Sequence, residues 1–243
     1  MRVTRLYVDA ALEPGARLRL PDAAAAHLVR VLRAHEGDVC VLFNGDGGDY
    51  AARIGAIGRR EVLVEVGVRS DIDNESPLRI ELLQGIARGE KMDLVLQKAT
   101  ELGIAAVRPV SSERSEVRLD PERAEKRLSH WQQVVASACE QSGRARLPEV
   151  SPPASLAAAL TELPPDALRL TLALDGAQSL SQLEPTTHVL LAAGPEGGWS
   201  PRDRELLDAA GFIGLRFGPR VLRTETAGIA AIAGLQACWG DLR

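Results

Sequence analysis

The sequence predicts an α/β protein of two domains, a small N-terminal β-barrel and a larger α/β domain with a mostly parallel sheet. Up to position 74, apolar residues form short runs or alternate with polar ones, which is typical of strands. A polar stretch, Asp71–Pro77, ends in proline and indicates a boundary. From Leu78 onward, strand-like and helix-like segments alternate, as they do when helices cover a parallel sheet. We therefore expect domains over residues 1–74 and 78–243.

The first domain contains several short strands and one helix. The expected strands are Leu6–Val8, Arg17–Leu20, Val39–Phe43, Tyr50–Ile57 and Glu61–Val68. The helix is expected over Ala23–Arg33, with Asp22 as its N-cap and Gly37 after its end. Asn44–Gly48 is a turn by composition, because its glycines supply positive φ.

The second domain follows the alternating pattern. Its expected strands are Arg79–Gln84, Ile104–Val110, Leu168–Leu174, His188–Ala193 and Ile213–Phe217. Its expected helices are Lys91–Leu102, Pro121–Ser142, Ser155–Leu163, one from Pro201 to Gly211, and Thr224–Trp239. The fourth helix has the clearest start signal, because Ser200 and Asp203 form a capping-box variant around Pro201.

The composition is ordinary for a soluble globular protein, with 45% hydrophobic and 26% charged residues among 243. No apolar run reaches the roughly 18 residues of a membrane-spanning helix, and no secretory signal is expected. Cys40, Cys139 and Cys238 are far apart and in no metal-binding spacing. We expect reduced thiols, no metal site, no membrane contact and a cytoplasmic location.

The net charge of −4 argues against wholesale electrostatic binding of nucleic acid. The charge is unevenly distributed, however. Residues 2–33 hold six Arg and three acidic residues, whereas residues 34–76 hold four Arg and nine acidic residues. This asymmetry fits an anionic ligand on one face, and chance in an arginine-rich composition explains it equally well.

Two loops follow expected strands at their carboxyl ends, where open α/β folds bind ligands. Gly194–Gly198 reads GPEGG, which is neither a Walker A loop nor GxGxxG, so a nucleotide-phosphate site is disfavoured. Phe217–Ala227 reads FGPRVLRTETA and places charged and hydroxyl side chains beside a helix rich in small residues. Read alone, the first loop is equally a tight turn. The second could be a helix cap formed by Thr224, but capping does not explain Arg223 and Glu225 beside a helix that can pack so closely.

Further polar motifs stand in a fixed order along the chain: RLYVD at 5–9, HLVRVLR at 27–33, ARGEKMD at 87–93, QKATELG at 97–103, SSERSEV at 111–117 and WQQVVASACEQSGR at 131–144. Each alone is compatible with a solvated surface. Together with GPEGG and GPRVLRTETA, the set closely resembles the bacterial ribosomal RNA uracil-N3 methyltransferases of the RsmE type, members of the SPOUT class. The resemblance covers nearly the whole chain.

The resemblance implies a PUA-like RNA-binding barrel over residues 1–74 and a SPOUT methyltransferase domain over residues 78–243 with a deep C-terminal trefoil knot. Such knots are very rare, and the periodicity of the sequence does not indicate one. The implied activity is transfer of a methyl group from S-adenosylmethionine to N3 of a specific uridine in 16S ribosomal RNA, free or within the small ribosomal subunit. The family also implies a homodimer, with the Thr224–Trp239 helix as the packing surface; the alternative is that this face packs only within its own subunit.

The resemblance also implies site residues. The expected cofactor-binding residues are Leu172, Leu174, Gly194, Pro195, Glu196, Gly197, Gly198, Phe217, Gly218, Leu222, Arg223, Thr224, Thr226 and Ala227. Arg144 and Arg223 are candidates for stabilising negative charge, and Glu140 and Glu225 for the general base. Each carboxylate has a structural alternative. Glu140 could join the network at its helix end, and Glu225 could pair with Arg220 or Arg223.

Local positive charge suggests which residues contact RNA phosphates: Arg2, Arg5, Arg17, Arg30, Arg33 and Arg88. Tyr7 and His27 are candidates for stacking on bases, with core positions as the alternative. Two other functions are compatible with part of this pattern. A SPOUT ribose 2′-O-methyltransferase would share the knot and cofactor, but QKATELG, EQSGR and the barrel favour the base methylator. A non-catalytic RNA-binding protein is disfavoured by the intact Gly197-Gly198 and Arg223-Thr-Glu-Thr.

Overall fold

The computed structural model describes residues 3–58, 61–115, 120–173, 175 and 178–242. The chain forms two compact units. Unit 1 consists of Met1–Glu75 with Ala136–Leu147, and unit 2 of Ser76–Val135 with Pro148–Arg243. One long helix, α3 (Pro121–Ser142), therefore contributes its first part to unit 2 and its last turns to unit 1.

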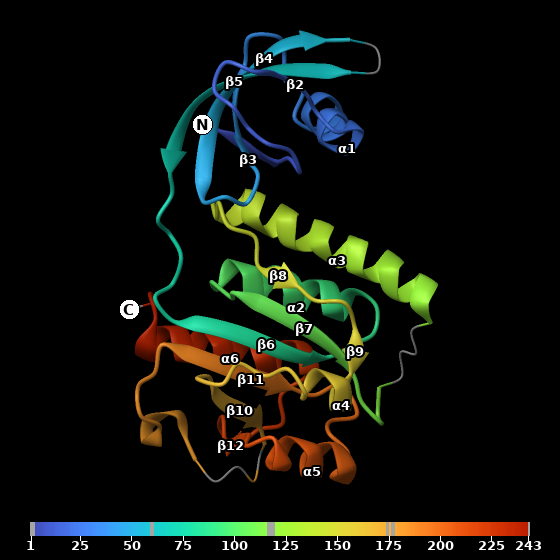
Figure 1. Ribbon diagram of the computed structural model, residues 1–243, viewed down its shortest axis with the longest axis vertical. Helices are drawn as coiled ribbons and strands as arrows, with labels where there is room; N and C mark the ends of the chain where they lie inside the picture. The colour runs from blue at the N-terminus through green and yellow to red at the C-terminus, as the bar shows by residue number, and fades with distance from the viewer. Residues whose placement is uncertain (1–2, 59–60, 116–119, 174, 176–177, 243) are drawn as a thin grey trace. The chain divides into compact units, whose positions relative to one another are not determined.

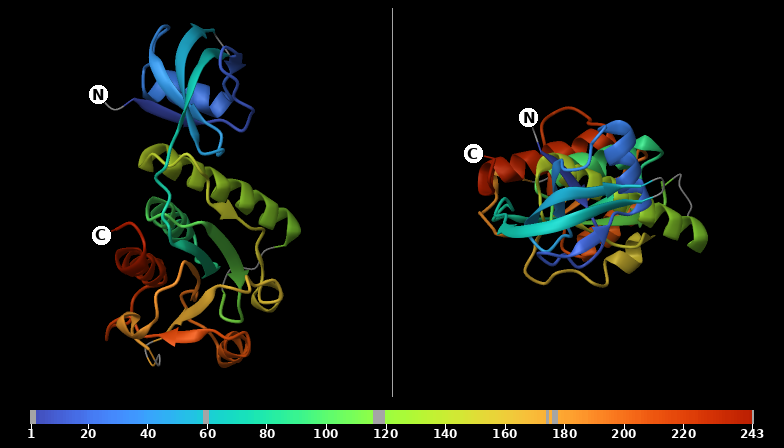
Figure 2. Two further views of the ribbon diagram at one scale, coloured as in Figure 1. Left: turned by 60° about the vertical axis from the view of Figure 1, so that its left-hand side comes forward. Right: turned by 90° about the horizontal axis from the view of Figure 1, so that it is seen from above.

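Unit 1 is built on a five-stranded sheet in the order β1-β3-β4-β5-β2. The strands are β1 (Thr4–Tyr7), β2 (Arg17–Arg19), β3 (Val39–Phe43), β4 (Gly48–Ile57) and β5 (Val62–Asp71). β1 pairs with β3 in parallel, and the other pairs are antiparallel. The strands curve around one hydrophobic cluster that includes Leu6, Leu42 and Val64 (Figure 2). All five strands lie where the sequence predicts them.

The helix of unit 1 differs from its expected form. Residues Asp22–Ala26 form a short α-helix, α1, and His27–Val31 continue as a π-helix, η1. Arg33, which follows, has φ 53°, a left-handed conformation that costs a residue with a Cβ roughly 1–2 kcal/mol. The helix therefore ends at Val31, several residues before the expected end signal at Gly37. π-Helical turns of this kind are frequent at functional sites.

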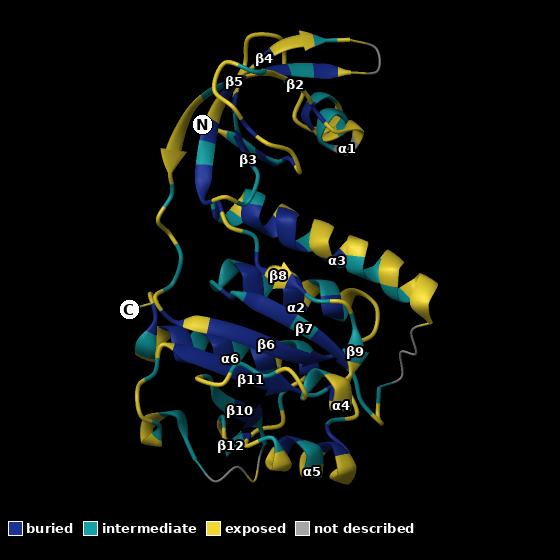
Figure 3. Cartoon of the chain, in the orientation of Figure 1, coloured by how far each residue is buried: buried dark blue, intermediate teal, exposed yellow. Residues whose placement is uncertain are grey.

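Unit 2 contains a fully parallel seven-stranded sheet, as the alternating pattern predicts (Figure 1). Six strands follow the order β12-β10-β11-β6-β7-β8, and β9 pairs with β7. Their bounds are β6 (Arg79–Gly85), β7 (Ala106–Ser111), β8 (Glu149–Val150), β9 (Ala154–Ser155), β10 (Leu168–Leu172), β11 (His188–Ala193) and β12 (Ile213–Leu215). β6 and β11 are almost entirely buried (Figure 3).

Helices pack against this sheet. They are α2 (Glu90–Glu101), the first part of α3, α4 (Leu156–Ala159), the 3-10 turn η2 (Leu180–Gln182), α5 (Pro201–Ala209) and α6 (Thr224–Trp239). α6 contacts α2, β6 and β11, so the last helix of the chain lies against the middle of the sheet (Figure 1). The capping box of Ser200 and Asp203 is confirmed, and α4 is shorter than predicted because a turn at Leu160 ends it. None of the described helices is both long and apolar enough to span a membrane.

Candidate functional site

A cleft of about 930 Å³ lies at the carboxyl ends of β10, β11 and β12, within the range of small-molecule sites. Parallel strands bring their carboxyl ends to one edge, so loops distant in sequence meet there. The lining residues are Lys91, Thr171, Leu172, Ala173, Asp175, Gly194, Pro195, Glu196, Gly197, Gly198, Trp199, Arg204, Leu207, Asp208, Gly214, Leu215, Phe217, Arg220, Val221, Leu222, Arg223, Thr224, Glu225 and Ala227.

The GPEGG loop after β11 is pressed against the end of β6. A Cβ added at Gly85 would lie 2.5 Å from the backbone nitrogen of Pro195, so a side chain there would displace the loop. Gly198 has φ 65°, a left-handed conformation that glycine adopts without strain. The path of the GPEGG loop, which lines the cleft, therefore depends on Gly198 within the loop and on Gly85 at the end of β6.

Polar contacts also anchor the GPEGG loop. Glu196 Oε1 accepts hydrogen bonds from the Arg88 backbone N–H (3.0 Å) and from Lys91 Nζ (3.1 Å). Burial opposes ionisation of Glu196, but backbone N–H groups and the Lys91 ammonium outweigh it and lower the pKa of this carboxyl. Arg114 Nη1 donates to the carbonyl of Gly197 at 3.1 Å. The loop is thus held by residues that follow β6 and β7.

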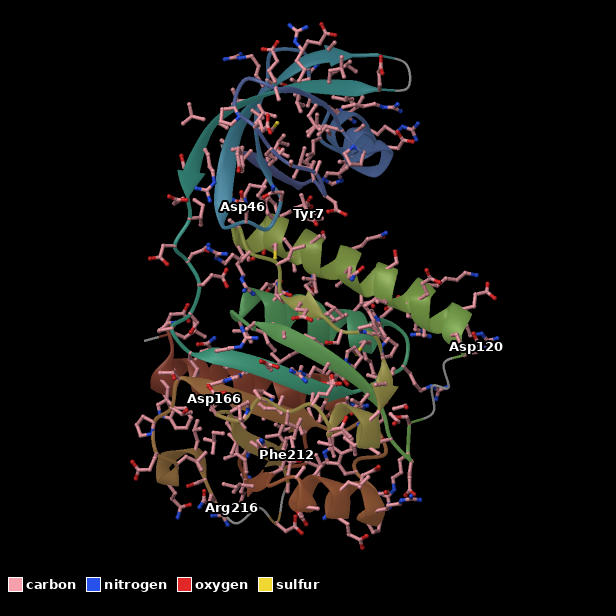
Figure 4. All side chains as sticks on the ribbon, viewed as in Figure 1. Tyr7, Asp46, Asp120, Asp166, Phe212 and Arg216 are labelled. Carbon is pink, nitrogen blue, oxygen red and sulfur yellow. The ribbon has the colours of Figure 1, made fainter. Side chains whose placement is uncertain are left out.

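The loop between β12 and α6 forms another wall. Phe212 and Arg216, labelled in Figure 4, stand just before and just after β12. The ring of Phe217 packs on Gly234 of α6, where a Cβ would lie 3.0 Å from ring carbons. At the other end, the carbonyl of Arg223 accepts the Ala227 N–H at 2.8 Å. Both ends of the loop are therefore fixed to α6.

Glu225, in the first turn of α6, has the least satisfied carboxylate of the cleft. Its Oε2 is buried without a hydrogen-bond partner among the described residues. Within that part of the chain it forms no ion pair with Arg220 or Arg223, the two partners considered from the sequence. Because a buried oxygen without a partner costs about 1–3 kcal/mol, Glu225 is suited to meet a ligand or a proton.

Most residues expected to bind a cofactor lie together around this cleft. The lining includes Leu172, Gly194, Pro195, Glu196, Gly197, Gly198, Phe217, Leu222, Arg223, Thr224 and Ala227. Gly218 and Thr226 belong to the same loop and helix but are not lining residues. Leu174 lies outside the described residues.

The other two candidate catalytic residues, Glu140 and Arg144, belong to unit 1 and do not line the cleft. Glu140 Oε1 accepts the backbone N–H of Tyr7 at 2.9 Å. Burial raises the pKa of Glu140, and the Tyr7 N–H, His27 and Arg5 offset only part of that effect. The Arg144 side chain is 5% exposed and pairs with Glu75 through Nε (3.0 Å) and Nη2.

The expected RNA-contacting arginines have different environments. The Arg5 side chain, 11% exposed, pairs with Asp49, donates to the Arg144 carbonyl at 3.0 Å and lies over the ring of Phe43. Arg17 is exposed and pairs with Glu65 across β2 and β5. Arg30, Arg33 and Arg88 are exposed, and Arg2 lies outside the described residues. Arg5 is therefore engaged within the fold, whereas the exposed arginines stay candidates for contact with phosphate.

The two candidates for stacking on bases, Tyr7 and His27, lie in different environments. Tyr7 (Figure 4) packs against Phe43 with ring centroids 5.7 Å apart and is partly buried. Burial, with a smaller effect of Asp9, raises the pKa of the Tyr7 hydroxyl. His27 is exposed on η1.

Sequence reasoning missed several lining residues. Thr171 is the next-to-last residue of β10, a strand already assigned to the cleft, so the carboxyl-end rule is sufficient to include it. Arg204 and Asp208 lie on α5, one turn apart, and no local signal distinguished them from a solvated helix face. Among the described residues, no group of three His, Cys, Asp or Glu side chains is placed to hold a metal ion.

Comparisons with known proteins agree with this geometry. The family described as RNA methyltransferase domain matches residues 74–236, and the family described as RNA methyltransferase PUA domain matches residues 20–67. The ribosomal RNA small subunit methyltransferase E of Buchnera aphidicola (subspecies Schizaphis graminum) is 32% identical over 243 residues, covering 99% of this chain and 98% of its own.

Solved structures give the same relationship. A ribosomal RNA small subunit methyltransferase E from Neisseria gonorrhoeae, crystallised with S-adenosylmethionine, is 40% identical with a TM-score of 0.91. A Legionella pneumophila protein in complex with the same cofactor is 38% identical with a TM-score of 0.96. Both alignments cover 100% of each chain.

Proposed function

Because the chain belongs to the ribosomal RNA small subunit methyltransferase E family, we propose that it methylates N3 of one uridine in 16S ribosomal RNA, with S-adenosylmethionine as methyl donor. One observation carries the proposal: the GPEGG loop and the loop before α6 meet around one cleft at the carboxyl edge of the sheet. Relatives that keep this fold over their whole length were solved with that cofactor.

The cleft fits the cofactor chemically. Apolar side chains such as Leu172, Leu215 and Leu222 suit a planar base, and the glycines of GPEGG allow a close approach of backbone groups. When bound, the cofactor supplies an electrophilic methyl group on a sulfonium sulfur.

The residues of this chain have to position the uridine and remove its proton. The N3 edge normally faces a base-pairing partner, so the target must be unpaired. Its acidity is close to that of a phenol, whose pKa is about 10, so little anion forms unaided at neutral pH. In our proposal Glu225 accepts the N3 proton, and Arg223 stabilises the negative charge that develops on O2 or O4.

Glu140 and Arg144 take structural roles in this proposal. Their polar atoms contact Tyr7 and Glu75 within unit 1, and Arg144 also offers its carbonyl to Arg5. The charge of Arg144 is therefore compensated inside the fold by Glu75, and that of Glu140 is compensated in part. We place both residues in the packing of the α3 end against the N-terminal strands.

The architecture belongs to the same proposal: a PUA-like RNA-binding domain over 1–74 and a SPOUT domain over 78–243 with a trefoil knot. The return of the chain from edge strand β12 to place α6 against central β6 and β11 supports the knot. We propose a cytoplasmic homodimer that packs through α6, whose Ala230, Ala233 and Ala237 are partly or fully exposed. Light scattering that gives a 26.0 kDa monomer at micromolar concentration would contradict the dimer.

Incubation of the protein with unmethylated 30S subunits, free 16S RNA and labelled cofactor tests the activity. Nucleoside digestion followed by mass spectrometry should give N3-methyluridine, in one of the two substrates at least. Methyl label on the ribose, or in no nucleoside although the cofactor binds, would overturn the proposed reaction.

A further inference from the structure

The mouth of the cleft carries an apolar side chain that the cofactor does not explain. Val221 is 80% exposed, the largest exposure among the large hydrophobic side chains of the described residues. It also lines the cleft, in the loop between β12 and α6. An exposed valine is unremarkable by itself, but this one stands at the entrance of the binding site.

Two arginines lie close to this side chain in the sequence, one residue before it and two residues after it. Arg220 and Arg223 are exposed, line the same cleft, and form no ion pair within the described residues. Nearby acidic residues have other partners: Glu196 is held by Lys91, and Asp175 lies 3.6 Å from Arg204. Asp208 and Glu225 also line the cleft, but neither pairs with Arg220 or Arg223 within the described residues, so both guanidinium groups are left open to a ligand.

The loop presents these residues in a defined conformation. Gly218 has φ 78°, Pro219 restricts its own φ, and the two ends are fixed by Phe217 on Gly234 and by the Arg223 carbonyl on α6. The exposure of Val221 is therefore a built feature and not the result of a loop without contacts.

We propose that Arg220 and Val221 are the docking surface for the target segment of single-stranded RNA, with Arg220 on a backbone phosphate and Val221 against the face of a nucleobase. This inference rests on the proposed function. The methyl donor has one carboxylate, which a single guanidinium is enough to pair, whereas an RNA strand offers both a series of anionic phosphates and flat apolar bases. Apolar contact at this point helps hold the target base unstacked beside the cleft.

Matched variants separate the two contributions. Arg220→Gln should raise the Kd for a single-stranded RNA containing the target sequence and reduce the salt slope of binding by about 0.7. Val221→Ser should raise the same Kd roughly fivefold without changing the salt slope. Leu94→Ser, which alters a 40% exposed leucine on α2 of unit 2 that does not line the cleft, is the control and should leave RNA binding unchanged.

Calorimetry with S-adenosylmethionine provides the second readout, and cofactor Kd should stay within about twofold in all three variants. Unchanged RNA binding in Arg220→Gln and Val221→Ser would overturn the inference, as would an effect on cofactor affinity alone. A shift of Val221→Ser from dimer to monomer in light scattering would assign the side chain to a contact between copies. Absence of RNA methylation by the wild-type protein would instead reject the proposed function.

Discussion

Two short segments of this protein have similar charged side chains in opposite environments. In Glu140–Arg144 of unit 1, the carboxylate accepts a backbone N–H and the guanidinium pairs with Glu75. In Arg220–Glu225 of unit 2, the arginines form no ion pair among the described residues, and one oxygen of Glu225 is buried without a partner. Residue type alone made both segments equal candidates for catalysis.

The difference teaches how to separate a structural charge from a functional one. A buried charge is costly unless it is paired and hydrogen-bonded, so a fold that compensates it locally uses it for packing. A charge left uncompensated beside a cleft retains its capacity to interact with a ligand. Four experiments test whether this distinction holds.

The largest effect is expected at the two glutamates. Glu225→Gln should lower turnover about 10²–10⁴-fold, because Gln cannot accept the N3 proton. Cofactor and RNA affinity should stay near normal, and raising the pH should partly restore the rate as more uridine ionises unaided. Single-turnover methylation with labelled cofactor measures this.

The matched variant Glu140→Gln should keep turnover within about threefold of the wild type. Removal of a catalytic base would lower turnover by about 100-fold or more. The folded-state pKa of Glu140 is raised, so its charged form destabilises the folded state above that pKa. Glu140→Gln should therefore be at least as stable as the wild type at pH 7. A 100-fold loss of turnover would return Glu140 to the catalytic site.

The second effect concerns Arg144. Arg144→Met should destabilise unit 1 by about 3 kcal/mol, because Glu75, whose side chain is 27% exposed, would lose its ion-pair partner. Denaturant titration followed by circular dichroism measures the loss. Cofactor affinity, which depends on unit 2, should change little, and a selective loss of cofactor binding would contradict the structural role.

The third effect is a pH dependence in unit 2. Glu81 is buried near the start of β6, an inner strand of the sheet. It accepts hydrogen bonds from Arg108 Nε (2.9 Å) and Arg79 Nε (3.1 Å), and His188 Nε2 lies 3.2 Å away. Burial opposes its ionisation, but Arg108 and Arg79 prevail and lower the pKa of Glu81 below its ordinary value of 4.5.

The stabilisation from Glu81 is therefore complete above about pH 4.5 and is lost as the pH falls through the lower folded-state pKa. Glu81→Gln should be less stable than the wild type at pH 7, and its free energy of unfolding should depend less steeply on pH between about 5 and 3. Denaturant titration of the wild type and the variant at several pH values measures this. The same pH dependence of the free energy of unfolding in both proteins would refute the role of this network.

The smallest effect is expected at Arg33. Arg33→Gly should be more stable than Arg33→Ala by up to about 1 kcal/mol, because only glycine accepts φ 53° without strain. If Arg33 contacts an RNA phosphate, both variants should reduce the salt slope of RNA binding equally, by roughly 0.7–0.9. Equal stability of the two variants would remove the strain argument, and an unchanged slope would remove the phosphate contact.

Local patterns in the sequence determined the secondary structure. A continuous apolar run placed β3, and apolar alternation placed β5. The glycines after α2, α3 and α5 marked their ends because Gly103, Gly143 and Gly211 adopt positive φ. The sequence of GPEGG and the following loop also determined most of the cleft lining. These features depend on neighbours within a few residues, and such neighbours are visible in the sequence.

Only the tertiary structure decided which charges have partners. Arg5 meets Asp49 and the Arg144 carbonyl, Glu140 meets Tyr7, and Arg114 meets Gly197, each across a separation of 44 residues or more. The same packing left Val221 exposed while Leu222 beside it is partly buried. Compensation of a charge and exposure of an apolar side chain depend on which distant segments the fold brings together, and no local pattern specifies these distances.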